Sequence, residues 1–140
     1  MKGGGKTRTA EGIKELHHRV VNELWNNGNL DAIDPYIHPE MQGRLRAAGM
    51  SPDDAKQIVR EFREAFPDLR LTVKYQLVEG DALATFSTMS GTHRGTFRGL
   101  EPTGRSMEVS TASYTKFSDG LIIEEAVVFD EQTVLAQLTG

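Results

Sequence analysis

Apolar residues in the first half of the chain recur at steps of three and four, the spacing of one face of a helix. The first such stripe consists of Ile13, Leu16, Val20 and Leu24. It predicts a helix over residues 10–26, ended by the Asn-Asn-Gly-Asn segment at 26–29. A second, short helix is expected over residues 30–37, bent or brief because it contains Pro35.

A third helix begins at Ser51-Pro-Asp-Asp54, where a capping serine precedes a first-turn proline and two acidic residues. Its apolar stripe is Ala55, Ile58, Val59, Phe62 and Phe66, and it ends before Pro67. Between the second and third helices, His38-Pro39 is expected to begin a loop. The first half of the chain is therefore predicted to be helical.

After Pro67 the period changes from helical spacing to two, which is typical of strands. The strands are expected over residues 69–78, 82–92, 95–98 (short), 106–117 and 121–129, with a closing helix over 131–138. Short turns such as Ser118-Asp-Gly120 join them, so an antiparallel, curved sheet is predicted, with the three N-terminal helices packed on one face. The fold class is α+β, a single domain over residues 9–140 after a disordered tail of residues 1–8.

Composition narrows the classes of function. The 140 residues carry a net charge of −4 and form no basic stripe, which argues against a nucleic-acid partner. Cysteine is absent, so no disulfide or thiolate chemistry is available, and the four histidines lack the spacing of a metal site. No signal peptide and no membrane-spanning apolar run of about 20 residues is found. We expect a cytoplasmic protein without a metal or membrane association.

The last predicted strand carries the most informative chemistry. Alternation puts Ile123, Glu125, Val127 and Phe129 on one face, so Glu125 is an acid on an otherwise apolar wall. Two interpretations stay open at this stage. Glu125 is a general base whose pKa is raised by burial, or it is an ordinary exposed side chain near the rim.

Several segments taken together resemble the SnoaL-like polyketide cyclase family, which has the nuclear-transport-factor-2-like (NTF2-like) fold. They are Trp25–Asp34, Tyr36–Glu40, Phe66–Arg70, Glu79–Asp81, Gly91–Gly99, Pro102–Arg105, Asp130 and Gln137–Leu138. The resemblance implies a conical α+β domain that is a homodimer, with a cofactor-independent pocket for a small hydrophobic or polyketide-like ligand.

The resemblance also assigns roles to positions on the last strands. The acid that removes a carbon-bound proton in the family's cyclases falls at Val127. The assisting polar residues fall near Ser113 and Thr111. A valine at the base position argues against the family's aldol cyclisation and makes Glu125, two residues earlier, a relocated base.

The other candidates each have a structural alternative. Asp130 is a catalytic acid or the cap of the closing helix, and His93 is a proton-transfer group or a hydrogen-bonding residue of a turn. Trp25 stacks on a ligand or closes the core. The hydroxyls of Thr111 and Ser113 orient a substrate or pair across strands, while Phe129 would line the pocket.

Two functions follow from these interpretations. The first is a cofactor-independent acid/base enzyme of secondary metabolism, of the cyclase, isomerase or hydroxylase type, with Glu125 as base and His93 and Asp130 as further candidates. The second is a non-catalytic ligand-binding protein of the same fold, which Val127 favours.

Overall fold

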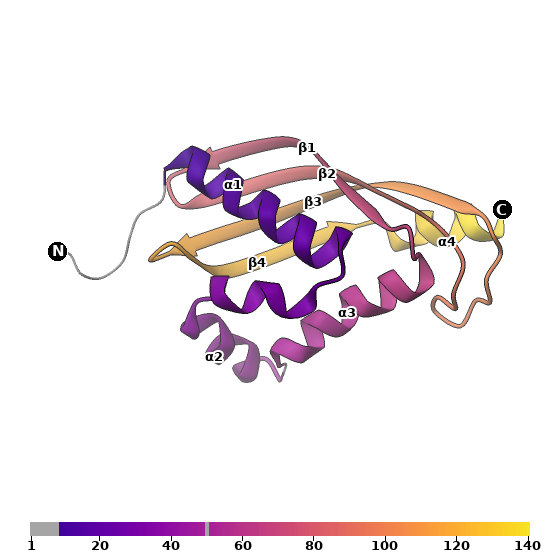
Figure 1. Cartoon of the computed structure of the whole chain (residues 1–140), viewed down its shortest axis with the longest axis horizontal. Helices are drawn as coiled ribbons and strands as arrows, with labels where there is room; N and C mark the ends of the chain where they lie inside the picture. Colours follow the sequence, from indigo (N-terminus) through magenta and orange to yellow (C-terminus); the bar gives the residue numbers. More distant parts are fainter. Residues whose placement is uncertain (1–8, 50) are drawn as a thin grey trace.

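Four antiparallel strands form one curved open sheet in chain order, β1-β2-β3-β4 (Figure 1). The computed structural model describes residues 9–49 and 51–140, so the predicted tail of residues 1–8 lies outside the described residues. The strands are β1 (Arg70–Glu79), β2 (Ala82–Thr92), β3 (Ser106–Ser118) and β4 (Leu121–Phe129). The α+β fold class predicted from the period change is confirmed, and the strand bounds differ from the prediction by a few residues at most.

Register determines which side chains share the face under the helices, here called the inner face. Gln76 pairs with Thr85, Thr85 with Ser113, and Ser113 with Val127, so these four residues form one row across the sheet. The next row contains Thr115 and Glu125. A register shift between Lys116 and Phe117 adds a residue to β4 near its start, and Ile122 and Ile123 are therefore both buried.

The predicted first helix is present but changes its winding. It begins as α1 (Ala10–Val20), capped by the Thr9 side chain, and continues as a π-helical stretch, η1 (Val21–Asn26). Its end is marked by a bond from Asn27 N–H to Asn22 O, five residues back. A 3-10 segment, η2 (Leu30–Tyr36), contains Pro35 and matches the short second helix that was expected.

The expected loop after His38 is instead a helix, α2 (Pro39–Ala47). His38 caps it, since its Nδ1 accepts the Glu40 N–H at 3.0 Å, and Pro39 occupies the first turn. The prediction of a loop was wrong because this segment has almost no apolar stripe. The segment is held to the sheet through His38 N–H, which donates to Ile122 O at 2.8 Å.

Helix α3 (Pro52–Ala65) starts with the predicted cap. The Ser51 side chain accepts the Asp54 N–H at 3.3 Å, while Asp54 accepts the Ser51 N–H at 2.7 Å. The predicted stripe holds for Val59, Phe62 and Phe66, whereas Ile58 is 45% exposed.

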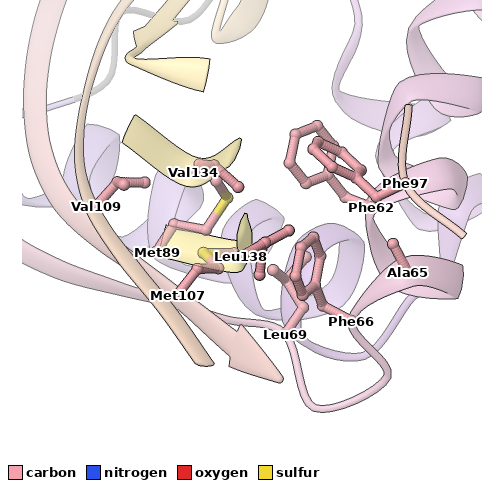
Figure 2. Close-up of a cluster of buried hydrophobic side chains, with 10 residues drawn as sticks. All are labelled: Phe62, Ala65, Phe66, Leu69, Met89, Phe97, Met107, Val109, Val134 and Leu138. Atoms are coloured by element: carbon pink, nitrogen blue, oxygen red, sulfur yellow. The ribbon is translucent and has the colours of Figure 1, made fainter. Parts of the chain in front are cut away.

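Two hydrophobic clusters hold the helices to the inner face. Cluster 1 joins α3, the sheet and the closing helix α4 (Glu131–Thr139), as Figure 2 shows. It contains Phe62, Ala65, Phe66, Leu69, Met89, Phe97, Met107, Val109, Val134 and Leu138. Cluster 2 joins α1 and α3 to the other end of the strands and contains Ile13, Leu16, Val20, Leu24, Val59, Leu83, Phe117 and Ile122.

Residues 95–98 do not form the short strand that was expected. The N–H groups of Arg94 and Gly95 both donate to Ala65 O, at 2.9 and 3.0 Å, so this segment pairs with the end of α3. A Cβ at Gly95 would collide with the Glu64 carbonyl, which is why a glycine is needed at this approach. The backbone of this segment therefore bonds to the end of α3 and not to a neighbouring strand.

Candidate functional site

Polar side chains gather on the inner face between the two hydrophobic clusters. We call this group the polar zone; it comprises Thr85, Ser87, Thr111, Ser113, Thr115 and Glu125. Thr85, Ser87, Thr111 and Thr115 are buried, with exposed fractions of 9% or less. Buried hydroxyls give a core little packing energy and need hydrogen-bond partners, so a polar zone inside a core is typical of a ligand site.

Glu125 is the one carboxylate that the four described strands place on this face. Its side chain keeps contact with solvent, yet desolvation by the surrounding protein raises its pKa to about 7. Neighbouring protein atoms therefore displace much of the hydration of the carboxylate, although the residue is still in part exposed.

The two ends of β4 are covered by other elements, and the middle of the strand is exposed. Near its start, Ile122 is buried and bonded to His38. At its end, the Phe129 ring packs edge-on against Phe62 of α3, with ring centroids 5.5 Å apart. Between them Glu125 is exposed and Val127 is 48% exposed. Part of the inner face is therefore accessible from solvent at this point.

Thr115 faces Glu125 directly across the β3–β4 pair. Its hydroxyl lies 2.8 and 3.2 Å from the two carboxylate oxygens. This hydrogen bond favours the ionised form and lowers the pKa, so it partly opposes the larger effect of desolvation. The carboxylate is thereby fixed in orientation while its pKa stays near neutral.

Trp25 lies where the two clusters meet and packs against both. It belongs to the π-helical stretch η1, and its ring lies 6.2 Å from that of Phe62 in an edge-on arrangement. Arg63 holds this end of η1 by donating to the carbonyls of Trp25 and Asn26, at 2.8 and 3.0 Å. Trp25 is thus a partly buried ring that closes the core beside the polar zone.

His17 and Gln76, which no local sequence pattern connects, also meet at this face. Gln76 Nε2 lies 3.3 Å from both His17 Nδ1 and Thr85 Oγ1, which joins α1 to the polar zone. Burial, and to a smaller degree the neighbouring His18, lower the pKa of His17 to about 4. The partner of His17 lies 59 residues away in the sequence.

His93 lies at a different place from Glu125. It follows β2, ten residues beyond the Leu83 row that contains Thr115 and Glu125, a separation of about 30 Å along the strand. Its Nδ1 accepts the Thr103 N–H at 3.1 Å, and the ring is fully buried beside Phe66. These contacts tie the two ends of the β2–β3 connection together.

Asp130 caps helix α4. Its carboxylate accepts the Thr133 N–H at 3.1 Å and the Thr133 hydroxyl proton at 2.8 Å, and these bonds lower its pKa. Gln137, later in the same helix, accepts the Glu108 N–H and donates to Glu108 O, so it pairs with the edge of β3 as a strand would. Both residues of the closing segment have structural partners.

A surface cleft of about 520 Å³ lies elsewhere, around Asp68, Thr92, Ser106, Glu108 and Gln137. None of the candidate residues lines it. Hydrogen bonds from Thr92 lower the pKa of Asp68, so its carboxylate is ionised at neutral pH.

Two absences hold for the described part of the chain. No three His, Asp or Glu side chains within residues 9–49 and 51–140 come together as metal ligands. No helix in these residues is long and apolar enough to cross a membrane.

Comparison with known proteins agrees with this fold. The family model for SnoaL-like polyketide cyclases matches residues 15–138. The chain belongs to the SnoaL-like polyketide cyclase family. Within this SnoaL-like chain the match spans all four strands and ends at the last turn of α4.

Solved structures of similar proteins show the same architecture. AclR from Streptomyces galilaeus, a candidate hydroxylase, has 27% identity and a TM-score of 0.79, covering 93% of this chain and 97% of its own. IdmH from Streptomyces antibioticus, a candidate polyketide cyclase, has 27% identity and a TM-score of 0.76, covering 91% and 99%. TsrD from Streptomyces laurentii has 22% identity and a TM-score of 0.80, covering 94% and 98%. None of the curated proteins matches the chain.

Proposed function

We propose that this SnoaL-like protein is an enzyme of secondary metabolism that needs no cofactor and uses Glu125 as a general base. The observation that carries the proposal is the carboxylate on the inner face with a pKa of about 7. A base with this pKa is half ionised at neutral pH and accepts protons well there. The polar zone would hold a small, oxygenated, polyketide-like ligand.

The proposed reaction begins with proton abstraction from a carbon next to a carbonyl group. Glu125 takes the proton, the C–H electron pair moves to the carbonyl oxygen, and an enolate forms. The hydroxyls of Ser113 and Thr111 face the same space and would donate hydrogen bonds to that oxygen. The enolate carbon then attacks a second carbonyl carbon of the ligand to close a ring, or the enolate is reprotonated at another carbon, as a cyclase or an isomerase would require.

Glu125 replaces the base expected at Val127 in this proposal. Both residues belong to the inner face of β4, and Val127 pairs with Ser113. A proton acceptor two residues earlier approaches the ligand from a position about 7 Å along the strand. Glu125 would therefore remove a proton from a different carbon of the ligand than a base at the position of Val127 would.

The base can be tested without knowing the natural substrate. 5-Nitrobenzisoxazole loses its C3 proton to a desolvated carboxylate, its N–O bond breaks, and a coloured cyanonitrophenolate forms. We expect the wild-type protein to catalyse this elimination with a rate that rises with pH to a plateau, with a midpoint near 7. Glu125→Gln should reduce the protein-dependent rate about 100-fold or more, the usual contribution of a general base.

Glu124→Gln is the matched control for that experiment. Glu124 is the neighbouring acid, and it pairs with Arg44 at 2.9 Å rather than with the polar zone. The Glu124→Gln variant should retain the wild-type rate of the elimination reaction. Equal rates for wild type and Glu125→Gln would remove Glu125 as the base.

A non-catalytic ligand carrier is the second candidate, and Val127 at the expected base position favours it. In that case a small molecule that co-purifies with the protein would be identical before and after prolonged incubation, as read by mass spectrometry. The carboxyl of Glu125 would then titrate near its ordinary pKa, and the elimination reaction would show no protein-dependent rate.

We further propose that the protein is a homodimer formed through the sheet face opposite the helices. Two adjacent rows of apolar side chains and tyrosines cross all four strands there. This outer patch consists of Tyr75, Leu77, Ala84, Phe86, Ala112, Tyr114, Ala126 and Val128. Tyr75, Leu77 and Val128 are 72%, 66% and 65% exposed. Contiguous exposed apolar surface of this kind is typical of a protein interface, and a second copy would cover it symmetrically.

A further inference from the structure

The connection between β2 and β3 contains a tight turn with an unusual residue in it. Phe97 and Leu100 exchange both backbone hydrogen bonds, at 3.0 and 2.8 Å, so Arg98 and Gly99 form the two-residue loop of a hairpin. The φ angle is positive at both, 49° for Arg98 and 80° for Gly99, as in a type I′ turn. Glycine adopts this conformation freely, whereas an arginine in it is strained.

A second turn of the same chain has the residues that such a turn usually contains. Asp119 and Gly120, between β3 and β4, have φ angles of 55° and 75°. Asp-Gly is a common sequence for a type I′ turn, because short polar side chains tolerate a positive φ. Arg98 therefore contradicts the local preference of its turn, and a strained residue of this kind indicates that other contacts hold it in place.

The guanidinium of Arg98 makes those contacts. Its Nη1 lies 3.0 Å from Glu61 Oε2 on α3, and its Nη2 lies 3.3 Å from Glu131 Oε1 on α4. Its Cζ lies 4.9 Å from the ring centroid of Phe97 and 5.8 Å from that of Phe62, which is the range of a cation–π interaction. One side chain therefore joins the turn to two helices that are far apart in the sequence.

The rest of this segment is anchored through the Phe97 ring. Phe97 is 2% exposed, and its ring centroid lies 5.1 and 5.4 Å from those of Phe62 and Phe66 (Figure 2). A cleft of about 270 Å³ lies beside the ring, lined by Glu61, Glu64, Thr96, Phe97 and Arg98. The segment is thus held to α3 by a ring and a guanidinium, with a cleft next to them.

We propose that residues 96–100 form a strap that Arg98 latches onto α3 and α4, and that this strap opens locally while the rest of the fold stays closed. The ion pairs of the latch are partly exposed, with 37% to 43% of each side chain open to solvent, so salt weakens them. A hairpin closed by two backbone bonds is not stable by itself, so these bonds break when the latch is released.

Opening of the strap affects the aromatic residues beside the candidate site. It removes Phe97 from Phe62, the ring that also contacts Trp25 and Phe129. The latch therefore controls how firmly Phe62 is held from the side of the β2–β3 connection. The strap does not depend on the role proposed for Glu125, since none of its contacts involves that residue.

Hydrogen exchange of the backbone amides of Phe97 and Leu100, followed by NMR, measures the opening. We expect both amides to exchange faster than those in the centre of β2, and by a similar factor, because they are released together. Raising the NaCl concentration from about 0.05 M to about 1 M should accelerate both about three- to tenfold, the effect of screening two partly exposed ion pairs.

The variant Arg98→Asn gives opposite expectations with and without a latch. Asparagine tolerates a positive φ better than arginine, so a turn without a latch would become more stable and its amides would exchange more slowly. With the latch, the loss of the ion pairs and ring contacts outweighs this gain. The two amides should then exchange about fivefold faster than in the wild type and no longer respond to salt. Arg94→Asn, at an exposed arginine of the same connection, should retain the wild-type rates.

The double variant Glu61→Gln/Glu131→Gln removes the partners of the latch and leaves the turn unchanged. It should accelerate exchange of the same two amides about threefold and abolish the salt response. Glu64→Gln is the control, because Glu64 lines the same cleft and forms no ion pair within the described part of the chain; it should behave as the wild type. Three results would overturn the strap: exchange in Arg98→Asn that is no faster than in the wild type, wild-type rates in the double variant, or wild-type amides that exchange only on global unfolding.

Discussion

The Thr115 hydroxyl lies 2.8 and 3.2 Å from the two carboxylate oxygens of Glu125, directly across the β3–β4 pair. Thr115 itself is fully buried, so the bond is formed away from bulk water. It is the one side-chain contact that opposes the desolvation of Glu125. The pKa of about 7 therefore reflects two effects of opposite sign, and each can be changed separately.

Replacing Thr115 with valine keeps the shape and removes the hydroxyl. The stabilisation of the ionised carboxylate is then lost, and the pKa of Glu125 should rise above 7 by about one unit. The pH midpoint of the nitrobenzisoxazole reaction measures this shift. Thr72→Val, on an exposed part of β1, is the control and should leave the midpoint in place. A midpoint that falls in Thr115→Val would contradict the proposed role of the hydrogen bond.

Glu125→Gln should make the protein more stable, and the gain should depend on pH. A carboxyl whose folded pKa is raised favours folding below its unfolded pKa of about 4.5, and this contribution is lost as pH rises through about 7. The glutamine does not ionise, so the stability of the variant does not decrease in this way as pH rises. Urea unfolding should show a larger advantage over wild type at pH 8 than at pH 4.5. A constant difference across this range would show that Glu125 has an ordinary pKa in the folded protein.

The period-two pattern was sufficient to find the face that carries Glu125. Alternation along β3 and β4 put Thr111, Ser113, Glu125 and Val127 on one wall, and the register agrees. The bulge that buries both Ile122 and Ile123 could not be read from alternation, because it is an interruption of that period. The facing pair of Thr115 and Glu125 depends on this bulge, since the bulge sets the register.

Elements that depend on contacts between distant parts of the chain were harder to predict from the sequence. Helix α2 has a central Gly43 and few apolar residues, so its stability comes from the His38 cap and from contact with the sheet. Its sequence signal was His38-Pro39 itself, a cap followed by a proline at the first position. The meeting of His17 and Gln76 across 59 residues had no local signal at all, because it depends on how α1 crosses the sheet.

The outer patch gives a prediction about assembly. Phe86 lies near its centre, with Tyr75 and Ala112 as cross-strand neighbours. Phe86→Lys would place a charge in the dimer interface, so sedimentation should report the monomer mass of about 15.5 kDa instead of twice that value. Thr72→Lys, outside the patch, should remain dimeric. If the wild-type protein is already monomeric at micromolar concentration, the interface proposal is wrong.

Arg63 holds the end of η1 that contains Trp25, and its contribution to stability can be tested. Its guanidinium donates to the carbonyls of Trp25, Asn26 and Leu69 through Nη1 and of Pro67 through Nη2, at 2.8 to 3.4 Å. Arg63→Met keeps most of the side-chain volume and leaves these carbonyls without their donor. We expect a loss of about 2–4 kcal/mol in the free energy of unfolding, measured with urea.

The matched control is Arg60→Met on the same helix, where the arginine is exposed and bonds to Gln57. It should change stability by less than about 0.5 kcal/mol. Trp25 fluorescence in the folded Arg63 variant distinguishes a local effect from a global one. A shift of its emission to longer wavelength would show that the end of η1 has moved into water. Arg63→Lys should restore little of the loss, because an ammonium group cannot reach the same carbonyls in the plane of a guanidinium.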